Sequence, residues 1–226
     1  MNKFLFWFIL FTPLLAVSQS DFDKAEKLFR EGNFKQSQLL FENIVKDNPS
    51  NTKSIEYLGD IQGNYRSWDR AMFYYEKLKK LKPSEANYYY KYGGALGMKA
   101  SESNKFKALG MIGEVKYSFE KAIQLNPKHI EARWALIELY LQLPRIVGGS
   151  EKKALYYANQ LAELSPVDGY LSKAHIAEYF KRFSEAEKQY KKAAEHGGSK
   201  KSHKTLENLN KFKMNQPNKA QSISNS

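Results

Sequence analysis

A glycine-rich segment and four histidines are the residues of this 226-residue chain whose types could do chemistry. Residues 93–99 read Gly-Gly-Ala-Leu-Gly-Met-Lys, which lacks the Gly-Lys-Ser/Thr ending of a phosphate-binding loop, and no strand precedes them. Small residues that let two helices pack closely explain this segment better. The histidines show no metal-ligand spacing on one helix face, and the chain has no Cys. We therefore expect no metal and no cofactor at His129, His175, His196 or His203.

A second candidate is residues 145–149, which read Arg-Ile-Val-Gly-Gly, like the activation site of trypsin-like proteases. The 81 residues from Ile146 onward have helical patterning, and they contain no Gly-Asp-Ser-Gly nucleophile segment. No set of Ser, His and Asp stands out, although a triad is defined in space and not in sequence. The segment is better explained as a turn in which two glycines supply unusual dihedrals and Ser150 caps the next helix. We expect no catalytic residues and a protein that is not an enzyme.

The elements that must position any site are helices, since the sequence after residue 20 has helical periodicity and no convincing strand. The helical pattern recurs. Pro49 and Pro83 lie 34 residues apart, and each closes a similar stretch with small and aromatic residues at matching places. Later stretches end at Pro127, at Pro166 and, without a proline, at Gly198. A plain helical bundle with accidental spacing is the alternative to a repeat.

This pattern resembles the tetratricopeptide repeat (TPR), a helix-turn-helix unit of ~34 residues. In that repeat small residues let helix A and helix B approach closely, an aromatic residue fills the gap to the next repeat, and proline stops helix B. The resemblance implies an all-α, right-handed TPR α-solenoid of about five repeats followed by a C-terminal cap helix. The predicted superhelix covers 19–198, with repeats at about 19–50, 52–84, 86–128, 130–167 and 168–198.

Two of the predicted repeats are longer than 34 residues. The third carries ten extra residues around 99–110 and the fourth carries five around 143–150, both between helix A and helix B. These insertions are expected on one edge of the solenoid, either as a binding decoration or as tolerated surface loops. Together with 92–97 and 119–123, the turn at 144–150 is similar to a group of small exported TPR proteins of Gram-negative bacteria. That resemblance implies architecture and localisation but no activity.

The N-terminal residues have the layout of a secretory signal peptide, predicted over 1–18. Lys3 precedes an apolar run from Phe4 to Val17, and Ala16-Val17-Ser18 places small residues at the two positions that a signal peptidase reads. This run of 14 residues is shorter than the ~20 that span a bilayer, although an uncleaved anchor is the alternative. We therefore expect export, with a periplasmic or extracellular location after cleavage.

The C-terminal residues follow a different pattern from the repeats. Leu206, Leu209 and Phe212 recur at helical spacing, which predicts the cap helix within 199–214. Residues 215–226 are polar without an apolar anchor, and we expect them to be disordered.

The charge of the chain bears on its possible partners. Thirty-six Lys and Arg residues against 24 Asp and Glu residues give a formal net charge of +12. Because the lysines are spread over helices, we expect them at solvent-facing positions and expect no nucleic-acid partner. A basic convex face in contact with acidic glycan or lipid is the alternative function, and membrane contact is expected only through this charge or an uncleaved signal. The lysines that illustrate this are Lys77, Lys79, Lys80 and Lys82.

In TPR solenoids helix A lines the concave face, chiefly through repeat positions 2, 5, 9, 12 and 13. Across the five predicted repeats these positions hold seven acidic and two basic residues. The resemblance therefore implies a non-catalytic interaction scaffold of the bacterial cell envelope, whose acidic, aromatic-lined groove binds a basic or apolar extended protein segment. Tyr90, Trp134 and Tyr179 are the expected anchors, unless they pack between helices. The predicted partner-binding residues are Phe22, Glu26, Phe29, Glu56, Asp60, Tyr90, Trp134, Glu138, His175, Glu178 and Tyr179.

Overall fold

The computed structural model describes the backbone of residues 12–196 and the side chains of residues 21–196. It divides into two compact units, Met1–Leu125 and Asn126–Ser226. The described residues form α-helices and one short 3₁₀ helix, with no strand among them. The predicted cap helix and tail, and the first eleven residues of the predicted signal peptide, lie outside the described residues.

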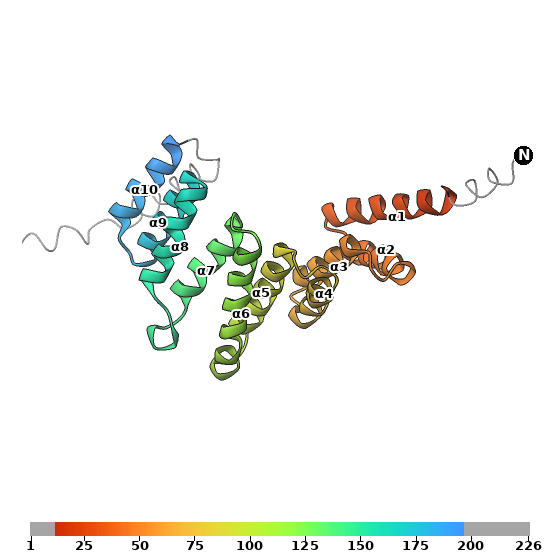
Figure 1. The fold of residues 1–226 in the computed structure, drawn as a ribbon, viewed down its shortest axis with the longest axis horizontal. Coiled ribbons are helices and arrows are strands. Elements are labelled where there is room, and N and C mark those ends of the chain that lie inside the picture. The colour runs from red at the N-terminus through yellow and green to blue at the C-terminus, as the bar shows by residue number, and fades with distance from the viewer. Residues whose placement is uncertain (1–11, 197–226) are drawn as a thin grey trace, which may run out of the picture. The chain divides into compact units, whose positions relative to one another are not determined.

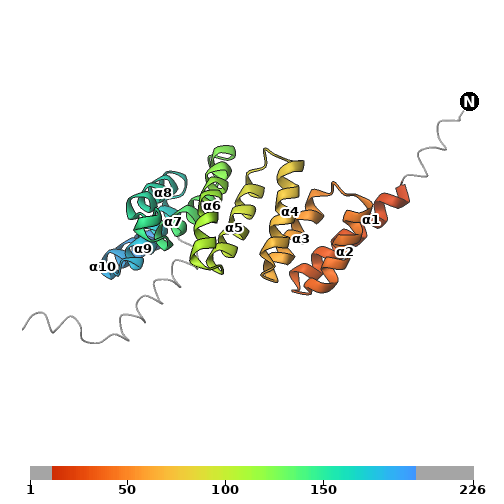
Figure 2. The same cartoon turned by 90° about the horizontal axis from the view of Figure 1, so that it is seen from below.

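The described part of the first unit, residues 12–125, contains six helices, which pack as consecutive antiparallel hairpins (Figures 1 and 2). The first helix begins before the predicted cleavage site and runs on without a break to Arg30. The helices are α1 (Thr12–Arg30), α2 (Phe34–Asp47), α3 (Thr52–Asn64), α4 (Trp68–Leu81), α5 (Ala86–Ser101) and α6 (Lys105–Leu125).

In the part of the second unit that the structure describes, residues 126–196, four α-helices also pack in sequence order. They are α7 (Ile130–Gln142), α8 (Glu151–Leu164), α9 (Pro166–Tyr179) and α10 (Phe183–Glu195), with the 3₁₀ helix η1 (Arg145–Val147) between the first two. The last hairpin begins at Pro166, two residues before the predicted repeat boundary at 168. Proline is well suited to the first position of a helix, and the Ser165 hydroxyl accepts a hydrogen bond from the Asp168 amide at 3.3 Å.

Close contact within a hairpin depends on small residues, as the repeat resemblance implied. A Cβ added to Gly59 of α3 would lie 2.5 Å from the ring of Tyr75 in α4. At Gly93 of α5, which the sequence assigned to helix packing, an added Cβ would lie 2.8 Å from the Cβ of Ser118 in α6. Each glycine therefore lets helix A approach an inward-facing residue of helix B.

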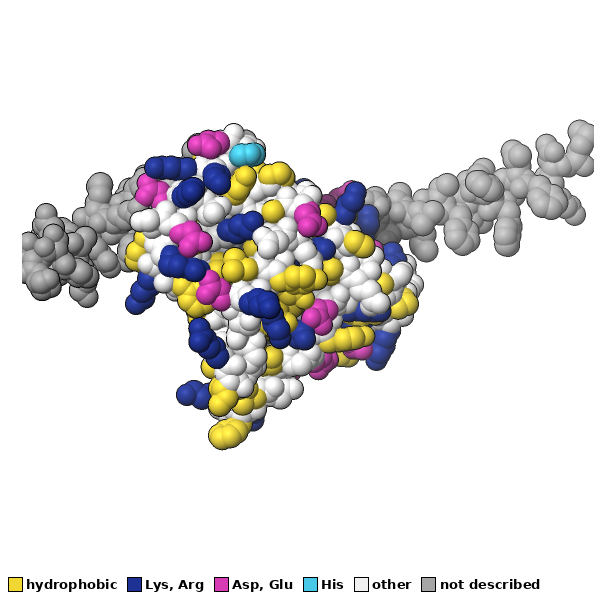
Figure 3. All heavy atoms as spheres, turned by 60° about the vertical axis from the view of Figure 1, so that its left-hand side comes forward, with side chains coloured by type: hydrophobic (Ala, Val, Ile, Leu, Met, Phe, Trp, Pro, Cys, Tyr) yellow, Lys and Arg dark blue, Asp and Glu magenta, His cyan; other side chains and the backbone are white. Residues whose placement is uncertain are grey.

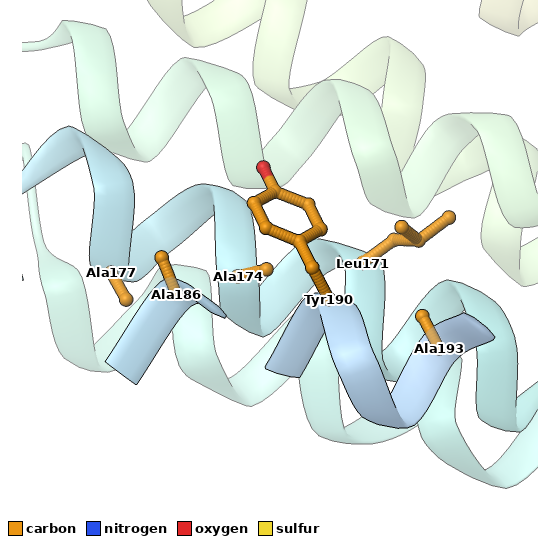
Figure 4. Packing of buried hydrophobic residues seen from close by; sticks show 6 residues of the cluster. All are labelled: Leu171, Ala174, Ala177, Ala186, Tyr190 and Ala193. Carbon is orange, nitrogen blue, oxygen red and sulfur yellow. The ribbon is translucent and has the colours of Figure 1, made fainter. Parts of the chain in front are cut away.

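The core of the second unit shows the same arrangement (Figure 4). Tyr190 of α10 is 3% exposed and lies among Leu171 and the small side chains of both helices of its hairpin. Leu and Tyr fill the space that the alanines leave open. The alanines are Ala174, Ala177, Ala186 and Ala193.

The two insertions differ from each other in structure. In the third repeat the extra residues lengthen α5 and α6, and only residues 102–104 form the turn. Of the two alternatives for this insertion, a tolerated surface loop is therefore not what the structure has. Residues 105–112 contain good helix formers and no proline. The side chain of Asn104 accepts a hydrogen bond from the amide of Lys107 at 3.0 Å, which begins α6 as an N-cap does.

The fourth-repeat insertion is the turn that the sequence predicted. Gly148 has a φ of 105°, a left-handed value that favours glycine. A Cβ at Gly149 would lie 1.8 Å from the carbonyl oxygen of Leu143. The Ser150 hydroxyl accepts a hydrogen bond from the amide of Lys153 at 3.3 Å, so Ser150 does cap α8.

Among the helices of the described part, none combines the length and the hydropathy needed to cross a membrane.

Candidate functional site

A groove lies between the two A helices at the start of the first unit, α1 and α3. Its volume is about 470 Å³. Four acidic residues and one basic residue are among the side chains that line it, together with two aromatic rings. These side chains are Phe22, Asp23, Glu26, Lys53, Glu56, Tyr57 and Asp60. Four of the predicted partner-binding residues therefore share one concavity.

The aromatic wall of this groove is a cluster around Tyr57. Its ring stacks on Phe41 at 4.7 Å between centroids, and meets Phe22 and Phe29 edge-on at 6.0 and 5.0 Å. Phe41 is fully buried, whereas Phe22 and Phe29 are half-buried. Phe22 and Phe29 both pack against the core. Phe22 also lines the groove, whereas Phe29 is not among its lining residues.

Polar contacts hold Tyr57 and Glu26 in place. The Tyr57 hydroxyl donates to Glu26 at 2.8 Å, and Arg30 donates to the other oxygen of the same carboxylate at 2.8 Å. Burial and the hydrogen bond to the Glu26 carboxylate raise the pKa of Tyr57 to about 12. The hydroxyl therefore stays protonated at neutral pH and acts as a donor.

Lys91 of α5 changes the charge expected for this region. Its ammonium group lies 2.7 Å from Glu56 and 2.6 Å from Asp60, both on α3. Burial alone would lower the pKa of Lys91, but the two carboxylates outweigh burial and raise it. The predicted ratio of seven acids to two bases left this lysine out, so the face is less acidic than expected. Asp60 also accepts the Tyr75 hydroxyl at 2.7 Å.

Three residues that the sequence prediction missed occupy one repeat position. Asp23, Tyr57 and Lys91 are spaced 34 residues apart. Each directly follows a predicted concave position, and the first two line the groove. Their common spacing was the available signal. The fixed set of repeat positions that the resemblance supplies does not include this position, and such a set does not describe the reach of a long lysine side chain.

In the second unit, Trp134 of α7 lies against α9. Its indole Nε1 donates to the Asp168 carboxylate at 3.0 Å, and its ring lies 6.4 Å from the ring of His175. Trp134 is half-buried and packs against the cluster that contains Tyr190. This residue is therefore partly a core residue, which was the alternative to a purely partner-binding anchor.

His175 also connects the two A helices of this unit. Its Nε2 lies 2.8 Å from the carboxylate of Glu138 on α7. The hydrogen bond to Glu138 raises the pKa of His175, and the same bond lowers the pKa of Glu138. Both side chains keep substantial exposure, 39% for His175 and 50% for Glu138, so solvent weakens their attraction.

The remaining predicted residues lie apart from these contacts. Glu178 accepts a hydrogen bond from the Tyr190 hydroxyl at 2.8 Å, which ties it to the core of the last hairpin. Tyr179 is 43% exposed and meets Phe180 edge-on at 5.2 Å. Tyr90 is half-buried, with its ring 6.0 Å from that of Phe119. Tyr179 is the most accessible of the three expected anchors.

No group of three His, Asp or Glu residues in the described part could hold a metal ion. Among the acidic residues of the groove, Glu26, Glu56 and Asp60 are engaged by Arg30, Lys91 and tyrosine hydroxyls, which fixes their orientation.

One expected solvent-facing lysine is packed instead. The side chain of Lys79 is 15% exposed, pairs with Glu76 at 2.7 Å and lies 3.8 Å from the centre of the Tyr92 ring. Its ammonium group thus pairs within α4 and also lies over an aromatic ring of α5, and position within a helix did not predict the second contact.

No protein-family model matches the chain, and no curated protein matches it. Solved structures do match. TTC0263, a thermophilic TPR protein of Thermus thermophilus, has a TM-score of 0.68 and 18% identity over 85% of this chain and 98% of its own. For MamA the TM-score is 0.58, with 22% identity over 79% of this chain and 91% of its own.

YrrB is described as a TPR protein with an unusual peptide-binding site. It matches with a TM-score of 0.51 and 15% identity over 78% of this chain and 84% of its own. These likenesses confirm the predicted fold, and the chain is an all-α protein of the TPR solenoid type.

Proposed function

We propose that the protein is a non-catalytic interaction scaffold, and that the groove between α1 and α3 binds an extended protein segment. The observation that carries the proposal is the groove of about 470 Å³ itself, in which aromatic rings and carboxylates converge. Two adjacent A helices form it, and the TPR fold of YrrB has a peptide-binding site as a precedent.

The composition of the groove indicates the chemistry of the segment. Arg30 pairs with Glu26, and Lys91 pairs with Glu56 and Asp60. With Lys53, these three cations are still outnumbered by the four carboxylates of the groove, which favours a segment with a Lys or Arg side chain. The aromatic rings of Phe22 and Tyr57 can pack against its aliphatic stem or against an apolar neighbour. A strongly acidic segment would be repelled. The faces of α7 and α9, with Trp134, Glu138 and His175, are a second place where the same kind of segment could bind.

Site-specific photocrosslinking in living cells tests this function. A photoreactive residue at position 53, which lines the groove, is compared with one at position 80 on α4, where Lys80 is exposed. We expect a discrete crosslinked protein at position 53 alone, which mass spectrometry can then identify. Crosslinks at position 80 alone, or at neither position, would contradict the groove assignment.

A charge variant gives an independent test of the preferred partner. Lys53→Glu removes the one basic side chain of the groove, so we expect tighter binding of the identified basic segment, by about fivefold. The matched control is Lys80→Glu, which makes the same charge change on the exposed face of α4 and should leave the affinity within twofold. Weaker binding by the Lys53 variant would show that the segment is not basic.

We also propose that the protein acts in the bacterial cell envelope. The motivating observations are the signal-peptide layout of residues 1–18 and the resemblance to exported TPR proteins. The groove begins at Phe22, after the predicted cleavage site, so processing would leave its lining residues in the mature protein.

A further inference from the structure

The outer face of α6 carries large apolar side chains that the described part of the chain leaves uncovered. Phe106 is 89% exposed, Tyr117 is 58% exposed and Leu109 is 46% exposed. Phe106 and Tyr117 are separated by three helical turns, or about 16 Å along the axis. In Figure 3 the lowest part of the described chain, which is the α5–α6 tip of Figure 1, shows hydrophobic side chains beside basic ones.

Two glycines lie between these aromatic residues on the same helix face. Gly110 and Gly113 are four and seven residues after Phe106, and seven and four residues before Tyr117, so the four residues form one strip. A Cβ added at either glycine would meet nothing within 4 Å, and neither glycine has a positive φ. Packing within the described chain therefore does not require these two glycines. Because glycine lowers the stability of a helix, their presence in α6 needs another reason.

The strip has the same order of residue types in both directions: aromatic, glycine, glycine, aromatic. Phe106, Gly110, Gly113 and Tyr117 are placed symmetrically about the midpoint between residues 111 and 112. If two copies of α6 pack antiparallel across a two-fold axis, Phe106 of one faces Tyr117 of the other, and each Gly110 faces a Gly113. Such an interface is self-complementary, as two-fold symmetry requires.

The charges beside the strip fit the same arrangement. Lys107 and Glu114 lie on one flank, and in the antiparallel pairing Lys107 of one copy comes within about 3 Å, along the axis, of Glu114 of the other. Symmetry makes this contact twice. Lys107 forms no ion pair among the described residues, and Glu114 accepts a hydrogen bond from the neutral Tyr92 hydroxyl at 2.7 Å.

We propose that α6 is a self-association surface, through which two copies of the protein form an antiparallel two-fold dimer centred on Gly110 and Gly113. The glycines let the two backbones approach closely, and the aromatic rings close the ends of the contact. A lipid surface would account for Phe106 and its neighbouring lysines, but it would account neither for the glycines nor for Glu114 beside them. This proposal is independent of the α1–α3 groove.

The expected dimer is weak. One helix face from each copy gives a small contact, and interfaces below ~1,200 Å² are typical of transient complexes. We therefore expect a dissociation constant on the order of 10 to 100 μM.

Sedimentation velocity of the full chain, from about 1 to about 500 μM, tests the proposal. The double variant Gly110→Gln/Gly113→Gln should raise the dissociation constant at least tenfold, because two side chains would separate the helices. Glutamine is a better helix former than glycine, so the monomer should remain folded. Phe106→Ser should weaken the dimer similarly, whereas Phe73→Ser, at a residue 67% exposed on α4, should leave it unchanged.

Disulfide crosslinking tests the antiparallel register. The chain has no cysteine, so Phe106→Cys and Tyr117→Cys each introduce one thiol. A mixture of the two variants should form a mixed disulfide, while Phe106→Cys alone should not, because its two thiols would be about 16 Å apart along the axis. A wild-type chain that stays monomeric up to ~500 μM, or crosslinks that favour identical positions, would overturn the proposal.

Discussion

At the scale of single residues, Lys91 shows how the first unit combines stability with an oriented acidic face. Its ammonium group bridges Glu56 and Asp60 across two A helices. Replacement by methionine would keep the aliphatic stem but leave two neighbouring carboxylates without their counter-charge. We expect Lys91→Met to lower the free energy of unfolding by about 2 kcal/mol, measured by urea denaturation.

The control for Lys91 is a lysine without such partners. Lys80→Met on α4 removes the same charge at an exposed position, and should change the free energy of unfolding by less than about 0.5 kcal/mol. Equal effects of the two substitutions would mean that net charge, and not the bridge, matters.

His175 and Glu138 give the second unit a pH dependence whose sign follows from the two shifts. The pKa of His175 is raised, so its contribution is complete below its unfolded pKa near ~6.5 and is lost as the pH rises through the folded value. The pKa of Glu138 is lowered, so its contribution is complete above ~4.3 and is lost on acidification. The pair therefore contributes most between these two values.

Thermal unfolding of wild type and His175→Gln across that range checks this prediction. The variant should melt at a lower temperature than wild type near pH 5.5, and the difference should disappear towards pH 9, since neutral imidazole and glutamine both lack the charge. A difference that grows at alkaline pH would have the wrong sign for this pair.

At the scale of elements, two helical glycines should respond to alanine in opposite directions. At Gly59 the added Cβ would lie 2.5 Å from the ring of Tyr75, and that ring cannot swing away freely because its hydroxyl donates to Asp60. We expect Gly59→Ala to destabilise the protein by about 1 to 3 kcal/mol. At Gly94 nothing lies within 4 Å, so Gly94→Ala should stabilise α5 by about 0.5 to 1 kcal/mol. Circular dichroism during urea unfolding measures both.

The helices could be predicted from the sequence because the repeat sets their spacing. Several signals act within a single repeat, so their effects are visible in the sequence. They are the prolines, the small residues Gly59 and Gly93, and the cap at Ser150. The lengths of α5 and α6 were not predicted, because ten extra residues within a helical hairpin can form either a loop or extra helical turns. Here they form extra helical turns, because the residues favour a helix and Asn104 caps the start of α6.

The candidate site was only partly predictable for a related reason. Repeat positions identify which backbone segments line a face, and Phe22, Glu26, Glu56 and Asp60 do line one groove. Which charges meet depends on side chains from the next helix, as with Lys91, whose head group reaches back to α3. Side-chain reach is a tertiary property that periodicity does not encode.

At the scale of the whole molecule, export predicts a defined N-terminus. Because the apolar run ends before Ser18 and α1 supplies its first groove residue at Phe22, cleavage after residue 18 should produce a chain that begins at Gln19. Intact-mass analysis and N-terminal sequencing of the protein from a periplasmic fraction check this. A chain that retains Met1 and sediments with membranes would support the uncleaved anchor.

The net charge of +12 allows the two candidate functions to be separated by salt. Adhesion of a basic surface to acidic glycan or lipid acts over distance, and the Debye length falls from ~30 Å at 0.01 M salt to ~8 Å at 0.15 M. Such adhesion should weaken at least tenfold over this range. A segment held in the groove contacts aromatic rings and partly buried carboxylates directly, so its affinity should fall by no more than about threefold. The measurement compares binding of the crosslinked partner segment with binding of anionic vesicles, using the same protein sample. A steep salt dependence of segment binding would assign the interaction to the basic surface instead.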